Sequence, residues 1–194
     1  MLGIVLCGGA SSRMGRDKGL IPTEKGNWAE KMLENFIQMN IPGLLSVNRK
    51  QVDQYQLVFP GVELICDNDS LHIKGPLAAV LGVHLKYPGD TLLVTACDMP
   101  LMNLAVLENL VNHYKKEPGY DGYIYTNEGE PEPLCGIYSA KGLASIKAIY
   151  DRGELSKHSM KFMLDHLSVI RIPIPETWKI YFRNINAHAD LNGL

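Results

Sequence analysis

The feature that most constrains the fold of this chain is an alternation, from one end to the other, of short apolar runs with segments of helical periodicity. The apolar runs have the length and residue types of buried strands, and the segments between them repeat apolar residues every three or four positions. Strands that alternate with helices form βαβ units around a mainly parallel sheet. We therefore expect one three-layer α/β domain over residues 1–194, with a mainly parallel, mixed central sheet.

The local patterns locate the individual elements. Strands are expected at 2–7, 44–48, 62–66, 91–96, 121–126, 134–138, 169–174 and 180–183. Helices are expected after the N-cap Asn27, from Pro76 to Tyr87, from the N-cap Asn103 to about Lys116, and at 140–150 and 156–167. Trp28, Met32, Leu33, Phe36 and Ile37 recur at the spacing of one buried helix face.

Composition and charge exclude several classes of protein. The net charge of −2 does not fit the basic surface of a nucleic-acid-binding protein. No apolar run approaches the roughly 18 residues of a membrane helix, and the opening MLGIVLCGG lacks the basic region of a secretory signal. The four cysteines form no C-x-x-C pair and are expected to be buried in a reducing compartment. We expect a cytoplasmic protein that binds small molecules, with neither nucleic acid nor membrane as partner.

A glycine-rich segment, LCGGASSRMGRDKG, follows the first expected strand. Open α/β sheets bind their ligands outside the carboxyl ends of the strands, which is where this segment begins. Gly8, Gly9 and Gly15 have no Cβ, so several backbone N–H groups can turn toward phosphate oxygens. Ser11 and Ser12 add hydroxyl donors. The segment is therefore predicted to bind phosphate groups.

The same segment carries two cations, Arg13 and Lys18, which suit the charge of a polyphosphate. Its spacing matches neither of the two commoner phosphate-binding loops. The pattern G-x-x-x-x-G-K-[ST] needs a Gly-Lys-Ser/Thr ending, and G-x-G-x-x-G needs alternating glycines. Neither pattern is present, and the alternative interpretation of the segment is a turn that happens to hold glycines and surface charges.

An aspartate, Asp98, directly follows an apolar strand within TACDMP. A carboxylate at this position is not explained by core packing, and it points to the same sheet edge as the glycine-rich segment. Mg²⁺ typically takes one or two carboxylates together with substrate phosphates and water. We therefore predict that Asp98 holds Mg²⁺, with a helix-capping role as the plainer alternative.

Two further aspartates, Asp67 and Asp69, end another expected strand within CDNDS. Either carboxylate could accept hydrogen bonds from a base or a ribose at the rim of a pocket. An Asx-turn is the alternative interpretation. The residues alone do not decide which of the two reads the base.

The glycine-rich segment is one of five stretches that match a known family. The others are the D-S-L…G-P-L stretch (69–77), A-C-D-M-P (96–100), E-P-L-C-G-I-Y (132–138) and N-I-N-A-H-A-D-L (184–191). Together they resemble the molybdenum cofactor guanylyltransferase (MobA) family of nucleotidyltransferases over nearly the whole chain. The first motif is shared with the sugar and cytidylyl branches of the superfamily, whereas R-M-G-x-D-K and the terminal N-I-N favour the molybdopterin branch.

The resemblance implies a Rossmann-like nucleotidyltransferase fold and a reaction in which the phosphate of molybdopterin attacks the α-phosphate of GTP and releases pyrophosphate. With the arguments above, the expected nucleotide-binding residues are Leu6, Cys7, Gly8, Gly9, Ser11, Ser12, Gly15, Lys18, Asp67, Asp69, Gly75 and Asp98. The expected catalytic residues are Lys18, Arg13 and Asp98, with Mg²⁺ at Asp98. Contacts to the pterin acceptor are expected from Lys157, Lys161, Asn184 and Asn186, and the resemblance also allows the two asparagines to complete the metal site instead.

GTP and molybdopterin are thus the expected small-molecule partners, and transient contacts are expected with cofactor-biosynthesis proteins or apo-molybdoenzymes. Two alternatives stay open. The chain could use CTP with the same pterin, or another nucleotide with a sugar phosphate. It could also be a carrier that binds the nucleotide cofactor without catalysing a reaction.

Overall fold

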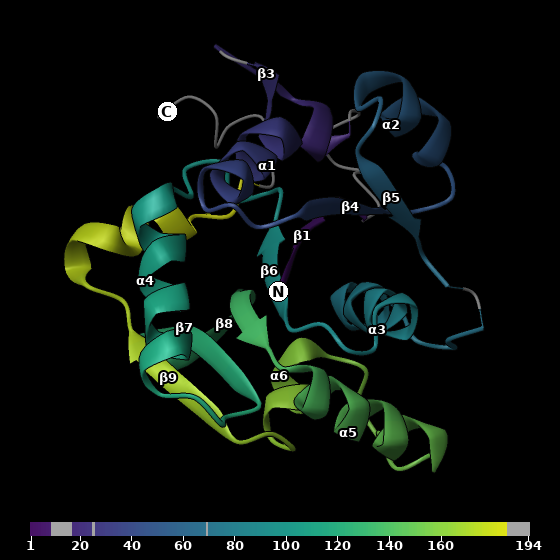
Figure 1. Cartoon of the computed structure of the whole chain (residues 1–194), viewed down its shortest axis with the longest axis vertical. Coiled ribbons are helices and arrows are strands. Elements are labelled where there is room, and N and C mark those ends of the chain that lie inside the picture. The colour runs from purple at the N-terminus through teal and green to yellow at the C-terminus, as the bar shows by residue number, and fades with distance from the viewer. Residues whose placement is uncertain (9–16, 25, 69, 186–194) are drawn as a thin grey trace.

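A computed structural model of the protein describes residues 1–8, 17–24, 26–68 and 70–185. Its centre is a seven-stranded sheet in the order β5-β4-β1-β6-β8-β7-β9 (Figure 1). The strands are β1 (Leu2–Leu6), β4 (Gly43–Val47), β5 (Glu63–Cys66), β6 (Leu92–Ala96), β7 (Gly122–Asn127), β8 (Glu130–Tyr138) and β9 (Val169–Pro173). Two short strands, β2 (Pro22–Thr23) and β3 (Gly26–Asn27), pair separately.

The sheet is mixed, as the sequence predicted. Strands β5, β4, β1 and β6 run parallel to one another, and β7 pairs in parallel with β9. Only β8, among the described strands of this sheet, runs antiparallel to its neighbours β6 and β7. The register sets Leu6 beside Ser46 on one side and Ala96 on the other, so β1, β4 and β6 end at one edge.

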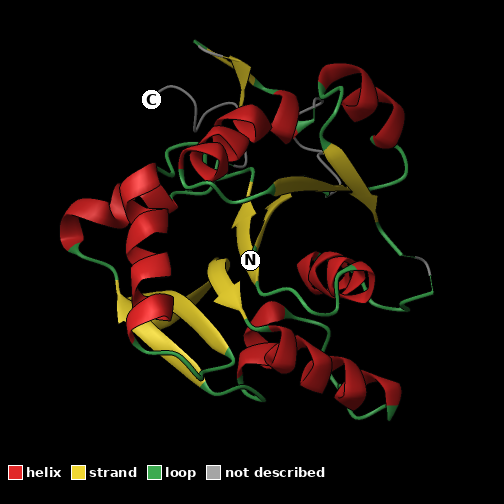
Figure 2. Ribbon diagram, viewed as in Figure 1, coloured by secondary structure: helices red, strands yellow, loops and turns green. Residues whose placement is uncertain are grey.

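Helices cover both faces of the sheet and complete the three layers (Figure 2). One face carries α1 (Trp28–Gln38), α2 (Val52–Val58) and α4 (Leu104–Lys116), and the other carries α3 (Pro76–Lys86), α5 (Ala140–Asp151) and α6 (Met160–Leu164). Alternate residues of β1, together with Cys7, which follows it, show why. Val5 and Cys7 pack into the apolar cluster of α1 and α4, whereas Ile4 and Leu6 pack into that of α3 and α5. A strand that is buried on both faces has a continuous run of apolar residues in its sequence.

The predicted helix starts are confirmed by side-chain geometry. The carboxamide oxygen of Asn27 accepts a hydrogen bond from the Glu30 backbone N–H at 2.9 Å. Asn103 accepts one from Val106 N–H at 3.1 Å. Pro76 is the first residue of α3, where its missing N–H costs no helical hydrogen bond. Local sequence chemistry therefore sets where three of the helices begin.

The strand expected at 180–183 is wrong, because this segment belongs to the 3₁₀ helix η2 (Glu176–Phe182). Trp178 and Phe182 both pack edge-on against the ring of Tyr125, with centroid distances of 6.4 and 5.1 Å. A strand would separate residues four apart by about 13 Å, whereas a 3₁₀ helix separates them by about 8 Å and lets both contact one ring. The described part of the sheet therefore ends with β9.

Three other expectations need correction. Ile37 is 71% exposed because Phe36 holds the face toward the sheet, and the next residue is rotated by about 100° around the helix. The helix expected at 156–167 is shorter, because α6 spans only Met160–Leu164. Its N-cap is Ser159, whose hydroxyl oxygen accepts a hydrogen bond from the Phe162 N–H at 3.1 Å. β8 begins at Glu130, earlier than the expected residue 134, and α2 was not expected at all.

The cysteines and the helices can also be compared with what composition indicated. Cys7, Cys97 and Cys135 are buried free thiols, and Cys66 is half-buried. Within the described ranges, no helix has both the length and the apolar character needed to cross a bilayer.

Candidate active site

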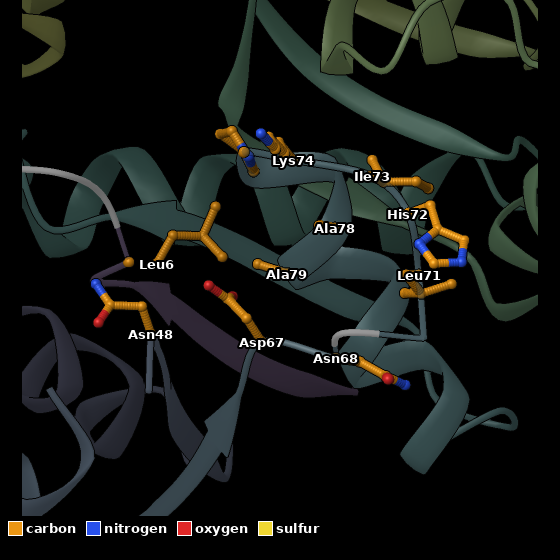
Figure 3. Close-up of a pocket in the computed structure, with 13 residues that line it drawn as sticks. Leu6, Asn48, Asp67, Asn68, Leu71, His72, Ile73, Lys74, Ala78 and Ala79 are labelled. Atoms are coloured by element: carbon orange, nitrogen blue, oxygen red, sulfur yellow. The ribbon is translucent and has the colours of Figure 1, made fainter. Parts of the chain in front are cut away.

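A cavity of about 600 Å³ opens at the edge where β1, β4 and β5 end (Figure 3). Its floor contains Leu6 and Gly8 from the end of β1, and Asn48 and Asp67 from the ends of β4 and β5. The remaining wall comes from the segment that leads into α3 and from its first turn, namely Asn68, Leu71, His72, Ile73, Lys74, Gly75, Pro76, Ala78 and Ala79. The cavity is thus apolar along α3 and polar along the strand ends.

Asp67 is the only carboxylate among the described residues that line this cavity. Its backbone N–H donates to the Val47 carbonyl at 3.0 Å, which extends the β4–β5 pairing by one residue. A Cβ on Gly8 would lie 3.9 Å from Asp67 Oδ1. The end of β1 therefore passes close to this carboxylate, and a side chain at position 8 would extend toward it.

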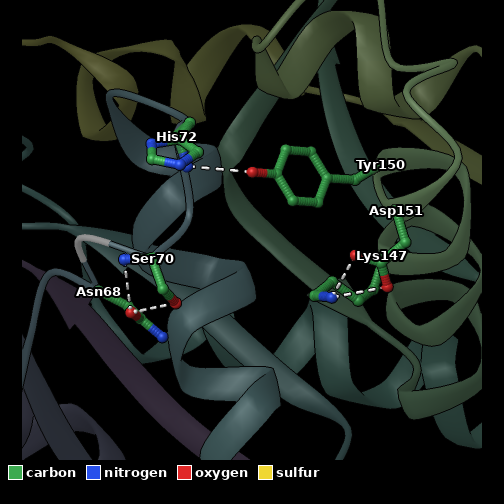
Figure 4. A network of polar contacts seen from close by, with 6 residues as sticks. All are labelled: Asn68, Ser70, His72, Lys147, Tyr150 and Asp151. Carbon is green, nitrogen blue, oxygen red and sulfur yellow. Dashed lines mark hydrogen bonds and ion pairs between the residues drawn. The ribbon is translucent and has the colours of Figure 1, made fainter.

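The segment after Asp67 is held by two kinds of hydrogen bond (Figure 4). Asn68 Oδ1 accepts from the backbone N–H of Ser70 at 3.0 Å and from its hydroxyl at 2.7 Å, which is an Asx-turn. The backbone N–H of His72 donates to the Tyr150 hydroxyl of α5 at 3.0 Å. The Asx-turn considered for Asp67 or Asp69 is thus formed by the residue between them.

Lys18 and Asp98 meet at the end of the neighbouring strand. Lys18 opens the 3₁₀ helix η1 (Lys18–Leu20), and its Nζ lies 3.4 Å from Oδ2 of Asp98, which follows β6. Asp98 sits beside β1, because Cys97 N–H donates to the Leu6 carbonyl at 3.1 Å. Both side chains are largely buried, with 18% of Lys18 and 26% of Asp98 exposed. The segment that follows β1 and the carboxylate that follows β6 therefore meet at the same edge of the sheet.

Asp98 has two further features that bear on chemistry. Among the described residues, its Oδ1 is buried and has no hydrogen-bond partner. Its backbone carbonyl accepts from the N–H of Ile185 at 2.8 Å. That hydrogen bond brings the exposed Asn184 next to the end of β6.

The thiol of Cys97, at the end of β6, stays protonated. A hydrogen bond with the Cys7 thiol, together with complete burial, holds the pKa of Cys97 well above its usual value. A thiol must lose its proton to act as a nucleophile. Cys97 therefore serves as a packing residue beside Asp98.

The comparisons with known proteins agree with this geometry. Residues 3–168 match the family model described as a MobA-like NTP transferase domain. The chain belongs to the MobA-like NTP transferase family. It is 31% identical to a protein of Methanosarcina mazei described as a probable molybdenum cofactor guanylyltransferase, over 98% of this chain and 88% of that protein.

Other relatives of this MobA-like chain extend the comparison. A protein of Flavobacterium johnsoniae with the same description is 28% identical over 98% of this chain and 94% of its own length. The crystal structure of molybdopterin-guanine dinucleotide biosynthesis protein A from Archaeoglobus fulgidus superposes with a TM-score of 0.78 at 24% identity, covering 99% of this chain and 95% of that one. The nucleotidyltransferase fold implied by the sequence is therefore confirmed.

In this MobA-like chain, the structure separates the expected nucleotide residues into two groups. Leu6, Gly8, Asp67 and Gly75 line the cavity, and Lys18 and Asp98 form the neighbouring pair. Cys7 lies between the groups, with its side chain buried in the core. Gly9, Ser11, Ser12, Arg13, Gly15, Asp69 and Asn186 lie outside the described residues.

The two lysines expected to contact the acceptor lie along β8 and α6. Lys161 Nζ is 2.8 Å from Glu130 Oε2, and Lys157 Nζ lies 6.0 Å from the centre of the Phe162 ring. β8 runs antiparallel, so its first residues lie at the edge where β6 ends. Neither lysine lines the described cavity.

Sequence reasoning missed residues that support the site. Asn48 lines the cavity. Gln51 and Tyr55 donate hydrogen bonds to the carboxylate of Asp17, the residue that precedes Lys18. They belong to α2 and the turn that precedes it. The apolar residues of 52–58 carried a helical signal that could have drawn attention to this segment.

Proposed function

We propose that the chain is a Mg²⁺-dependent guanylyltransferase that transfers GMP from GTP to the phosphate of molybdopterin and releases pyrophosphate. The observation that carries the proposal is the meeting of Lys18 and Asp98 beside the cavity that contains Asp67. The descriptions of the relatives from F. johnsoniae and M. mazei support the same activity.

The cavity has the size and the lining that a nucleoside needs. Small-molecule sites commonly have volumes of about 300 to 1,000 Å³ and combine apolar walls with a few polar groups. Here Ala78 and Ala79 offer an apolar surface to a base, and Asp67 offers a carboxylate at the polar end. Guanine presents N–H donors along one edge, which a carboxylate accepts. We assign the recognition of guanine to Asp67.

The reaction needs no activated nucleophile, because a phosphate acceptor is already an anion at neutral pH. The site must instead align the phosphates and neutralise their charge. Lys18 supplies a cation next to Asp98, and Arg13 is proposed to supply a second. Lys157, Lys161, Asn184 and Asn186 are proposed to bind the pterin acceptor.

The residues around Asp98 fit a magnesium ion. Mg²⁺ is usually held by one or two carboxylates, and phosphates and water complete its ligands. The buried Oδ1 of Asp98, which has no hydrogen-bond partner within the described ranges, is a free ligand atom. In those same ranges no group of three or more His, Cys, Asp or Glu could form a complete metal cage. When bound, the ion would neutralise charge on the phosphates.

Product formation tests the proposal directly. The protein is incubated with Mg²⁺, molybdopterin and either GTP or CTP, and pyrophosphate release is measured. We expect release with GTP and much less with CTP, and GTP should raise the melting temperature more than CTP does. A preference for CTP would contradict the guanylyl assignment, and nucleotide binding without pyrophosphate release would favour a carrier.

A further inference from the structure

The carboxylate of Asp17, one residue before Lys18, is surrounded by hydrogen-bond donors. The Tyr55 hydroxyl donates to Oδ1 at 2.7 Å, and the backbone N–H of Gly19 donates to the same oxygen at 3.0 Å. The side-chain amide of Gln51 donates to Oδ2. Asp17 therefore has both carboxylate oxygens engaged, and it does not line the cavity.

Gln51 connects this carboxylate to two strand ends. Its Nε2 also donates to the Cys7 carbonyl at 2.9 Å, and its Oε1 accepts from the Asn48 backbone N–H at 2.8 Å. Rotation of the amide by half a turn would set its NH₂ against the Asn48 N–H and its oxygen against Asp17. The orientation of this buried side chain is thus determined by its partners.

The packing around Gly19 shows how closely the segment is held. A Cβ on Gly19 would lie 2.2 Å from the Tyr55 hydroxyl oxygen and 3.4 Å from Cys7 Sγ. On the other side of Lys18, Ile21 N–H donates to the Lys18 carbonyl at 3.1 Å. The backbone of Lys18 is therefore fixed on both sides, while its side chain reaches Asp98.

From these contacts we propose that Tyr55 and Gln51 are positioning residues, which set the place of the Lys18 ammonium group through Asp17. The inference rests on the proposed function, since it assigns to Lys18 the contact with the nucleotide phosphates. Neither Tyr55 nor Gln51 lines the described cavity, so they act on the ligand only through the residues they hold. Misplacement of a reacting group by about 1 Å can lower a rate by about 10²-fold.

The ionisation of Tyr55 is consistent with this role. Burial, followed by the nearby thiols of Cys7 and Cys97 and by Asp17, raises the pKa of Tyr55 above its usual value. The hydroxyl therefore keeps its proton and remains a donor to Asp17 at neutral pH.

Tyr55→Phe removes the donor and keeps the ring, and Gln51→Met is a second variant that removes the amide. Tyr123→Phe is the matched control, because its buried hydroxyl donates to the Glu117 carbonyl at 2.6 Å, away from the strand ends that form the site. Each variant is made in the wild type and in Lys18→Ala. The kcat and KM for GTP are measured with Mg²⁺ and molybdopterin, and the melting temperature is recorded.

We expect Tyr55→Phe and Gln51→Met to lower kcat about tenfold in the wild type and to have little further effect in Lys18→Ala, because residues that act through one group are not additive. Tyr123→Phe should lower the melting temperature about as much as Tyr55→Phe does, and it should leave kcat unchanged. Equal losses with and without Lys18, or a kcat loss no larger than that of the control, would overturn the proposal.

Failure of the proposed function would look different. If the wild type releases no pyrophosphate from GTP, the guanylyl assignment fails, and the same coupling is measured on the Kd of whichever of GTP and CTP it binds with Mg²⁺. Non-additive losses of affinity between Tyr55→Phe and Lys18→Ala would then still support the positioning role, and additive losses would refute it.

Discussion

Replacement of Gly19 by alanine is expected to destabilise the protein, because the new methyl group has no room. Its Cβ would lie 2.2 Å from the Tyr55 hydroxyl oxygen, whereas the next nearest ring atom, Cζ, would be 3.3 Å away. Gly19 lies in the 3₁₀ helix η1, whose backbone alanine can adopt. The conflict is therefore with one oxygen atom, and Tyr55 must move or the helix must shift.

The size of the effect follows from these contacts. Overpacking a well-packed interior costs about 1 to 3 kcal/mol. A gain of about 0.4 to 1 kcal/mol offsets part of this, since alanine restricts the unfolded chain more than glycine does. The net loss should be roughly 1 to 2 kcal/mol, which lowers the melting temperature by about 2 to 8 °C in a protein of this size.

Urea unfolding of the single and double variants measures the conflict. In a Tyr55→Phe background the oxygen is absent, so Gly19→Ala should cost less than about 0.5 kcal/mol. Gly82→Ala in α3 is the control, because the nearest atom to its Cβ would be 3.9 Å away and alanine favours a helix. The reasoning would be refuted if Gly19→Ala were as stable as the wild type. It would also be refuted if Gly19→Ala lowered the free energy of unfolding as much in the Tyr55→Phe background as in the wild type.

Three further predictions concern the site and the core. Lys18→Ala and Asp98→Ala should each lower the rate of pyrophosphate release at least about 10²-fold, and near-normal turnover would remove that residue from the proposed chemistry. Asp67→Asn should weaken GTP binding about tenfold by calorimetry with little effect on folding, and unchanged affinity would assign the base elsewhere. Burial, and then the charge of Lys147, lower the pKa of His84 from its usual 6.5. As the pH falls, the unfolded chain protonates this histidine at a higher pH than the folded chain does. The free energy of unfolding therefore falls as the pH drops below about 6.5. His84→Leu should flatten that fall in urea unfolding, and an unchanged slope would contradict it.

Much of the architecture could be predicted from the sequence because local signals agree with tertiary packing. The continuous apolar runs of β1 and β6 indicated strands buried on both faces, and both are. Asn27, Asn103 and Pro76 marked helix starts through hydrogen bonds or a missing N–H that depend only on nearby residues. The end of each parallel strand then placed Asp67 and Asp98 at one edge.

The failures occurred where distant contacts decide the structure. The helical form of η2 depends on Tyr125, which lies far from Trp178 and Phe182 in the chain. The roles of Gln51 and Tyr55 depend on Asp17, in a segment that is separate in sequence. A pattern search for phosphate-binding residues finds the glycines and the cations, but it does not find the residues that hold their backbone.

The antiparallel course of β8 has a consequence for how such a protein can diversify. The β7–β8 turn consists of Glu128 and Gly129, whose φ angles of 52° and 87° suit a two-residue type I′ hairpin. Because β8 is reversed, this turn projects from the edge that carries Asp98, and Glu128 pairs with Lys179 at 2.9 Å. Insertions there would reshape one flank of the edge while leaving the cavity around Asp67 intact. Under the proposed function, the molecule that receives the nucleotide could thus change during evolution while the proposed nucleotide site is kept.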